Sequence, residues 1–224
     1  EAKVTDTWPQ RALFTTKSAR FNRASNDNLS RSTSGGSYRK MTFSCWSKKS
    51  DLAEMCLLGF SNGSSNPQFF IKWDNANEIA VGQYTGVYDV RLVSNAVYRD
   101  VSAWYHVVVA VDTTQGTASN RVKIYINGNQ VTSFSIETYP DLNEDLKING
   151  NVNTCSISDL YNGYGYQEYG GYLAETVLID GQQLDPTSFG VANSDGVWTP
   201  IPYTGTFGTN GFNLQFENAA ALGT

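Results

Sequence analysis

Apolar and polar residues alternate in short runs along most of this chain, and such alternation predicts β-strands. In residues 41–47, Met41, Phe43 and Cys45 fall on one face of the predicted strand. Comparable runs cover residues 56–60, 69–73, 79–84 and 88–92. Short strands at roughly ten-residue spacing are typical of an all-β sandwich. No run keeps the period of an amphipathic helix over a useful length.

The two strongest predicted strands lie in the middle of the chain. Residues 103–112 include a nearly continuous apolar run, which is typical of a buried strand, whereas residues 121–126 alternate. Asn127-Gly128 then predicts a tight hairpin, because Asn and Gly tolerate the positive φ that a type I′ turn needs. Asp180-Gly181 is a second hairpin signal of the same kind.

The pattern predicts one folded domain with an extension at each end. Residues 1–18 are polar and show no clear period, so we interpret them as an N-terminal arm. Residues 19–190 hold the predicted strands of the sandwich, and Asp185-Pro186 predicts the cap and first residue of one helical turn. Residues 191–224 are extended and rich in turns, with a closing strand expected within them at 212–216.

Composition and charge narrow the functional classes. The 224 residues carry 16 Lys and Arg against 21 Asp and Glu, a formal net charge of -5. Because nucleic-acid binding relies on a basic surface that faces the phosphates, we expect no nucleic-acid partner. The longest apolar run, residues 107–111, is far shorter than the ~20 residues of a membrane-spanning helix, so we expect no membrane insertion.

Cysteine and histidine are too sparse for a zinc site. Cys45, Cys56 and Cys155 include no C-x-x-C pair, and His106 is the single histidine. We expect three free thiols, with one disulfide plus a free thiol as the alternative. No nucleophile signature such as G-x-S-x-G accompanies His106, so we interpret it as a hydrogen-bonded strand residue and not a catalytic base.

Three motifs, in this order, resemble the concanavalin A-like lectin/glucanase superfamily in its laminin G-like and pentraxin-like branches. They are Trp104-x-His106-Val107, the hairpin of residues 122–128, and the segment 171–175 followed by Asp180-Gly181. The resemblance covers about residues 18–190. It implies an all-β fold in which two antiparallel sheets form a jelly-roll sandwich.

Further segments are similar to modules in virion proteins of tailed bacteriophages. They are residues 20–22, 29–31, 42–48, 112–114, 179–182 and 203–212. This resemblance implies a non-enzymatic virion structural protein, a tail fibre or a capsid decoration, on the surface of the particle. Such a protein adheres to a host-surface glycan or coats the particle. In these relatives Leu222-Gly223 precedes further sequence, so we expect the chain to continue.

The same resemblance implies the partners. They are other virion proteins, further copies of this chain in a homo-oligomer such as a trimer, and a host cell-surface glycan. The alternative hypothesis is a free secreted or cell-surface carbohydrate-binding lectin, which would bind a defined glycan as an isolated domain.

The sequence disfavours a glycoside hydrolase. Glucanases of the resembled fold place paired carboxylates at alternating positions of one strand, and the reaction needs two such groups. Here no segment matches the E-x-D-x-x-E arrangement. We therefore expect no enzymatic activity.

Calcium is the candidate cofactor. It prefers carboxylate, amide and carbonyl oxygens, which lectin-like relatives supply from loops at the rim. The candidate ligands are Asp141, Asn143, Glu144 and Asp145, with Asp74, Asn75 and Asn77 as a second set. Neither set matches a calcium motif residue by residue, and ordinary surface turns are the alternative interpretation.

Residues 161–172 are unusually rich in tyrosine and glycine. A tyrosine ring offers a flat apolar face and a hydroxyl at low entropic cost, which suits sugars and protein partners. The predicted ligand or partner surface consists of Tyr161, Tyr164, Tyr166 and Tyr169. The alternative is that Tyr169 and Tyr172 pack at strand ends within the domain.

Overall fold

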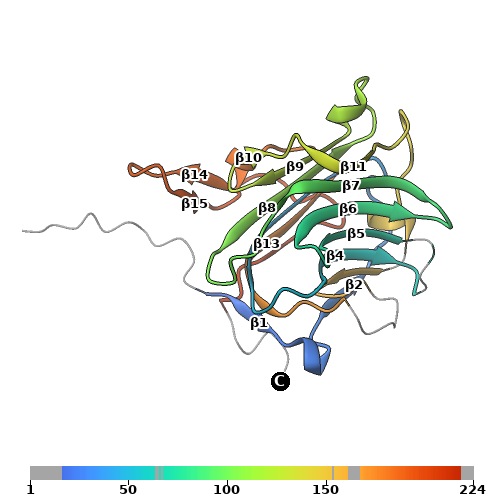
Figure 1. The fold of residues 1–224 in the computed structure, drawn as a ribbon. Coiled ribbons are helices and arrows are strands. Elements are labelled where there is room, and N and C mark those ends of the chain that lie inside the picture. Colours follow the sequence, from blue (N-terminus) through green and yellow to red (C-terminus); the bar gives the residue numbers. More distant parts are fainter. Residues whose placement is uncertain (1–16, 64–65, 67, 153, 161–166, 218–224) are drawn as a thin grey trace, which may run out of the picture.

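A computed structural model describes residues 17–63, 66, 68–152, 154–160 and 167–217. Two seven-stranded sheets, whose recorded strand pairs are all antiparallel, make up most of this part of the chain, and this confirms the predicted all-β sandwich. Figure 1 shows β4 to β7 as one curved layer of the sandwich.

Sheet A contains, in spatial order, β1 (Ala19–Phe21), β13 (Gly171–Asp180), β3 (Lys40–Lys49), β8 (Tyr105–Asp112), β9 (Val122–Ile126) and β10 (Asn129–Gln130). A short strand, β16 (Phe212–Leu214), also pairs with β13. It confirms the closing strand predicted within residues 212–216.

Sheet B contains, in spatial order, β11 (Phe134–Thr138), β7 (Tyr88–Val97), β6 (Glu78–Tyr84), β5 (Gln68–Trp73), β4 (Met55–Ser61), β12 (Thr154–Ile157) and β2 (Leu29–Ser32). A two-stranded ribbon is formed by β14 (Gly190–Ala192) and β15 (Trp198–Pro200). The helical turns are η1 (Arg23–Ser25), η2 (Ala118–Asn120), η3 (Asn149–Asn151) and η4 (Pro186–Ser188). In the described ranges no helix has the length and apolar character that crossing a bilayer would take.

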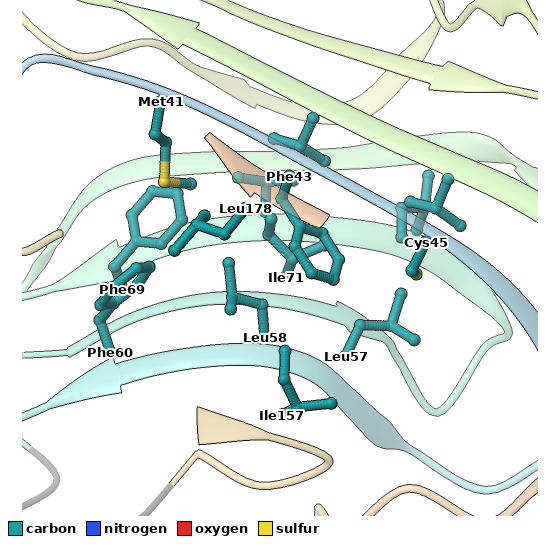
Figure 2. Packing of buried hydrophobic residues seen from close by; sticks show 14 of the residues in the cluster. Met41, Phe43, Cys45, Leu57, Leu58, Phe60, Phe69, Ile71, Ile157 and Leu178 are labelled. Atoms are coloured by element: carbon teal, nitrogen blue, oxygen red, sulfur yellow. The ribbon is translucent and has the colours of Figure 1, made fainter. Parts of the chain in front are cut away.

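The main core lies between the two sheets. Met41, Phe43 and Cys45 of β3 are fully buried, as their alternation predicts, and they face apolar side chains of β4 and β5 (Figure 2). The facing residues include Leu57, Leu58, Phe60, Phe69 and Ile71. Burying one such side chain contributes about 1.5–3 kcal/mol, so this layer dominates the stability of the fold.

The two predicted hairpin signals have different outcomes. Asn127 and Gly128 adopt φ values of 49° and 80°, and they connect β9 to β10 as expected. Asp180-Gly181, by contrast, ends β13 without a hairpin. The Asp180 carboxylate instead accepts hydrogen bonds from Ser37 and Asn210, which lie far away in the sequence. The hairpin prediction at Asp180-Gly181 is therefore wrong.

The C-terminal segment, here residues 184–207, packs on the outer face of sheet A. Val108, Val177 and Ile179 point to that face and pack against Phe189, with further apolar residues around them. The segment begins with η4, where Asp185 Oδ1 accepts a hydrogen bond from the Thr187 backbone N–H at 2.8 Å. The predicted cap and single helical turn are thus confirmed.

All three cysteines are buried as free thiols, which confirms the first of the two alternatives. Burial raises the pKa of the Cys45 thiol far above its usual value, and it raises the pKa of Cys155 to about 12. These thiols stay protonated at neutral pH and act as small apolar core residues.

Candidate functional site

A hollow of about 350 Å³ lies on the outer face of sheet B, over strands β5 to β7. Its volume is at the lower end of the range for small-molecule sites. The lining residues are Glu54, Phe70, Lys72, Asp74, Asn75, Ala80, Val81, Tyr88, Arg91, Val93 and Gln167. Among the described residues, the C-terminal segment packs on the outer face of sheet A, and Leu160 packs with Phe70 and Cys56 on the outer face of sheet B.

Strand register builds the floor of this hollow. Phe70 lies opposite Gly82 of β6, and Gly82 lies opposite Arg91 of β7. A Cβ atom on Gly82 would come within 2.5 Å of the Phe70 ring, so the ring lies directly on the glycine. Phe70 is consequently 3% exposed and acts as a buried floor beneath the more open side chains.

Tyr88 supplies the exposed ring of the hollow. Its side chain is 42% exposed, and it packs edge-on to Phe70 with 6.4 Å between ring centres. The Tyr84 ring also packs against Tyr88, with 5.1 Å between the two ring centres. An aromatic ring that is held from below but open to water can pack against the C–H face of a sugar.

Polar groups surround this ring. Lys72 forms an ion pair with Glu54, and its Nζ lies 4.6 Å from the centre of the Phe70 ring. The Arg91 guanidinium lies 4.4 Å from the centre of the Tyr88 ring. Asp74 Oδ1 accepts hydrogen bonds from the backbone N–H groups of Ala76 and Glu78, so it stabilises a turn. The hollow combines an apolar ring with convergent hydrogen-bonding groups, as small-ligand sites do.

The predicted tyrosine surface is tested at one position. Tyr161, Tyr164 and Tyr166 lie outside the described residues, and for them the prediction stands as it was. Tyr169 is fully buried: its hydroxyl is 2.8 Å from Ser47 Oγ, and its ring packs against Phe21. The assignment of Tyr169 to a contact surface is therefore wrong, and for this residue the alternative of packing within the domain is confirmed. For Tyr172 that alternative fails, because its side chain is 40% exposed.

In the Asp141–Asp145 loop, the carboxylates of Glu144 and Asp145 are bound by protein groups. Glu144 accepts hydrogen bonds from Gln83 Nε2 at 3.0 Å and from the Asp141 backbone N–H at 2.8 Å. Asp145 Oδ1 lies 2.6 Å from Arg39 Nε, and Asn143 adopts a positive φ of 63° in the turn. Over the described part of the chain, no group of three or more His, Cys, Asp or Glu side chains is placed to hold a metal ion.

Two residues of the second candidate set for calcium, Asp74 and Asn77, also bind protein groups. Asp74 stabilises its own turn, and Asn77 Oδ1 accepts a hydrogen bond from Lys49 Nζ at 3.0 Å. An ammonium group at Asn77 opposes a second cation at that position. Asn75 is exposed and lines the sheet-B hollow.

His106 is a structural residue on the outer face of sheet A. Its Nδ1 accepts a hydrogen bond from the Trp198 indole N–H at 2.8 Å, and an indole nitrogen can only donate. We therefore assign the proton to Nε2, which donates to Ser44 Oγ at 2.9 Å. Burial lowers the His106 pKa to about 3, so the ring is neutral at pH 7. The predicted role as a hydrogen-bonded strand histidine is confirmed.

Sequence reasoning missed the sheet-B hollow. Its residues come from separate strands that look like ordinary alternating runs, and only cross-strand register brings them together. One signal was present: a glycine inside a strand, such as Gly82, often marks the close approach of another group.

Comparison with known proteins gives a family match. The family model described as the concanavalin A-like lectin/glucanases superfamily matches residues 22–164. This range includes ten of the eleven residues that line the sheet-B hollow. A search of curated protein sequences finds no match.

Solved structures share the fold at low sequence identity. A candidate carbohydrate-binding protein from Bacteroides ovatus superposes with a TM-score of 0.55 at 13% identity, over 92% of this chain and 53% of that protein. Domain 4 of an extracellular arabinanase from Geobacillus stearothermophilus, in complex with arabinotriose, gives 0.51 at 17% identity, over 76% and 73%. A heptameric pentraxin from Limulus polyphemus gives 0.50 at 14% identity, over 76% and 74%. At these identities the likeness concerns the fold alone.

Proposed function

Because the chain belongs to the concanavalin A-like lectin/glucanases superfamily, we propose that it is a carbohydrate-binding domain whose sugar site is the sheet-B hollow. The observation that carries this proposal is the half-exposed Tyr88 ring, supported by Phe70 and surrounded by charged side chains. The complex of the arabinanase domain with arabinotriose supports it, since that domain has the same fold.

We propose further that binding occurs without catalysis. Glycoside hydrolysis needs one carboxyl group as an acid and a second as nucleophile or base. Both carboxylates that line the hollow are engaged, because Glu54 pairs with Lys72 and Asp74 caps a turn. Neither is arranged as a free proton donor, so we expect a bound oligosaccharide to remain intact.

On the wider role, we propose that the domain belongs to a virion structural protein of a tailed bacteriophage. There it would mediate adhesion to a host-surface glycan or decorate the particle, as a homo-oligomer with other virion proteins. The support is the similarity of residues 20–22, 29–31, 42–48, 112–114, 179–182 and 203–212 to such modules. A free secreted or cell-surface lectin is the alternative. Co-purification with phage particles supports the virion role, and its absence from intact particles would count against it.

The binding proposal predicts that Tyr88→Ala weakens glycan binding by about tenfold or more. Truncating an aromatic residue at the centre of a binding site costs on the order of 2 kcal/mol, and about 1.4 kcal/mol corresponds to tenfold. Binding would be measured by glycan array and then by isothermal titration calorimetry of the strongest ligand.

Tyr172 offers a matched control, because it is 40% exposed but lies on β13 of the other sheet. We expect Tyr172→Ala to bind as the wild type does. Equal binding by the wild type and Tyr88→Ala, or no binding of the wild type to any glycan, would refute the proposal.

A further inference from the structure

Arg91 brings to the sheet-B hollow a positive charge that the protein does not neutralise. Among the described residues, none forms an ion pair with its guanidinium within 4.0 Å. Its recorded contact is with the face of the Tyr88 ring. The side chain is half-buried and lines the hollow, so its charge lies at the edge of that space.

The other charges of the hollow are already matched. Lys72 and Glu54 form an ion pair, and Gln167 Nε2 lies 3.4 Å from the same Glu54 oxygen. The Asp74 carboxylate receives two backbone N–H groups. Of the charged side chains that line the hollow, Arg91 is therefore the one with no recorded ion pair or hydrogen bond within the described part of the chain.

The contact between the Arg91 guanidinium and the Tyr88 ring bears on what Arg91 can bind. A guanidinium that lies over an aromatic ring uses its flat face for the contact, while its N–H donors point outward along the edge. That edge matches the two oxygens of a carboxylate in a bidentate hydrogen-bonded pair. The Tyr88 ring beside it offers apolar surface for the body of a sugar.

We propose that the ligand of the hollow is an acidic glycan, in which a sugar carboxylate pairs with Arg91 while the sugar packs beside Tyr88. The proposal rests on the proposed function and narrows it from carbohydrates in general to sugars that carry a carboxylate. A pairing of this kind adds orientation as well as affinity, because both oxygens must face the guanidinium.

The test uses two matched pairs of probes in calorimetry at constant salt. One pair is sialyllactose and lactose, and the other is an oligogalacturonide and its methyl ester. We expect the carboxylated member of at least one pair to bind the wild type at least tenfold more tightly than its neutral partner. The pair that shows the preference identifies the type of acidic sugar.

Variants assign the preference to Arg91. Arg91→Gln is expected to reduce the ratio of acidic to neutral affinity to near one. Arg91→Lys is expected to give an intermediate ratio, because lysine keeps the positive charge but lacks the paired N–H donors of the guanidinium. Arg99→Gln is the control, since Arg99 is exposed and does not line the hollow. It should keep the wild-type ratio.

The outcomes separate this proposal from the proposed function. Neutral probes that bind as tightly as acidic ones, in a way that Tyr88→Ala abolishes, would overturn the acidic-glycan proposal and leave the sugar site in place. A preference for acidic probes that survives in Arg91→Gln would also overturn it. If the wild type binds neither the neutral nor the acidic probes and no glycan on an array, both proposals fall.

Discussion

Acidification from pH 7 to pH 4.5 is expected to lower the free energy of unfolding by about 2–3 kcal/mol through His106 alone. Burial lowers the pKa of this imidazole from 6.5 to about 3 in the folded protein, whereas in the unfolded chain it titrates near its ordinary value. At pH 7 the ring is mostly neutral in both states. Below about pH 6.5 His106 becomes protonated in the unfolded chain but stays neutral in the folded protein, so proton binding favours unfolding.

This loss has a defined window and a physical cause. It develops below about pH 6.5 and levels off near pH 3, where the folded state also protonates. The cause is that both ring nitrogens are committed, Nδ1 to Trp198 and Nε2 to Ser44, beneath the stacked ring of Trp46. A second proton would have to displace the indole N–H from Nδ1 in a buried site.

Urea unfolding at a series of pH values, with His106→Gln as the comparison, isolates the effect. Carboxyl groups titrate in both proteins, among them Glu78 and Glu144, whose pKa values burial raises, so their contribution cancels in the difference. We expect the variant to be less stable at pH 7 but to lose about 2–3 kcal/mol less than the wild type on going to pH 4.5. Equal losses in the two proteins would show that His106 is not held neutral by burial.

Gly128→Ala is expected to destabilise the domain by about 2–5 kcal/mol. Gly128 has a φ of 80°, where an L-residue with a Cβ atom costs about 1–2 kcal/mol. The added Cβ would also lie 2.8 Å from Cε3 and Cζ3 of Trp198, and overpacking of this kind costs about 1–3 kcal/mol. Because Trp198 donates to His106, a displaced indole would also leave the buried imidazole without its partner.

Two further substitutions separate these causes in equilibrium urea unfolding. Gly128→Asn tolerates the left-handed backbone but still carries a Cβ, so its loss reports the contact with Trp198. Gly116→Ala is the control, because no atom lies within 4 Å of the added Cβ, and we expect a change within about 0.5 kcal/mol. If Gly128→Ala is no more destabilising than Gly116→Ala, the packing of Trp198 on this hairpin is not a source of stability.

The strands of the core could be predicted from the sequence because their alternation is local. Alternation places Met41, Phe43 and Cys45 on one face whatever the position of β3 in the sheet. Asn127-Gly128 forms its turn because both residues tolerate a positive φ. Asp180-Gly181 has the same local preference but a different outcome. There the carboxylate is bound by groups from residues 37 and 210, and no local pattern contains that information.

The candidate site could not be predicted for a similar reason. Phe70, Gly82 and Arg91 meet through the register of three strands, and alternation along each strand does not fix which residues lie opposite one another. Tyr169 shows the opposite error. Its position in a glycine-rich segment predicted an exposed ligand surface. Its hydroxyl contact with Ser47 places it inside the domain.

Mapping a bound glycan by NMR shows whether it lies on the outer face of sheet B. In a titration of the labelled protein with the tightest ligand from the array, we expect the largest shifts at the backbone amides of Phe70, Gly82 and Arg91 and at the Tyr88 ring. Largest shifts on sheet A instead, around Tyr172 or the ribbon of β14 and β15, would place the glycan elsewhere and refute a sugar site on sheet B.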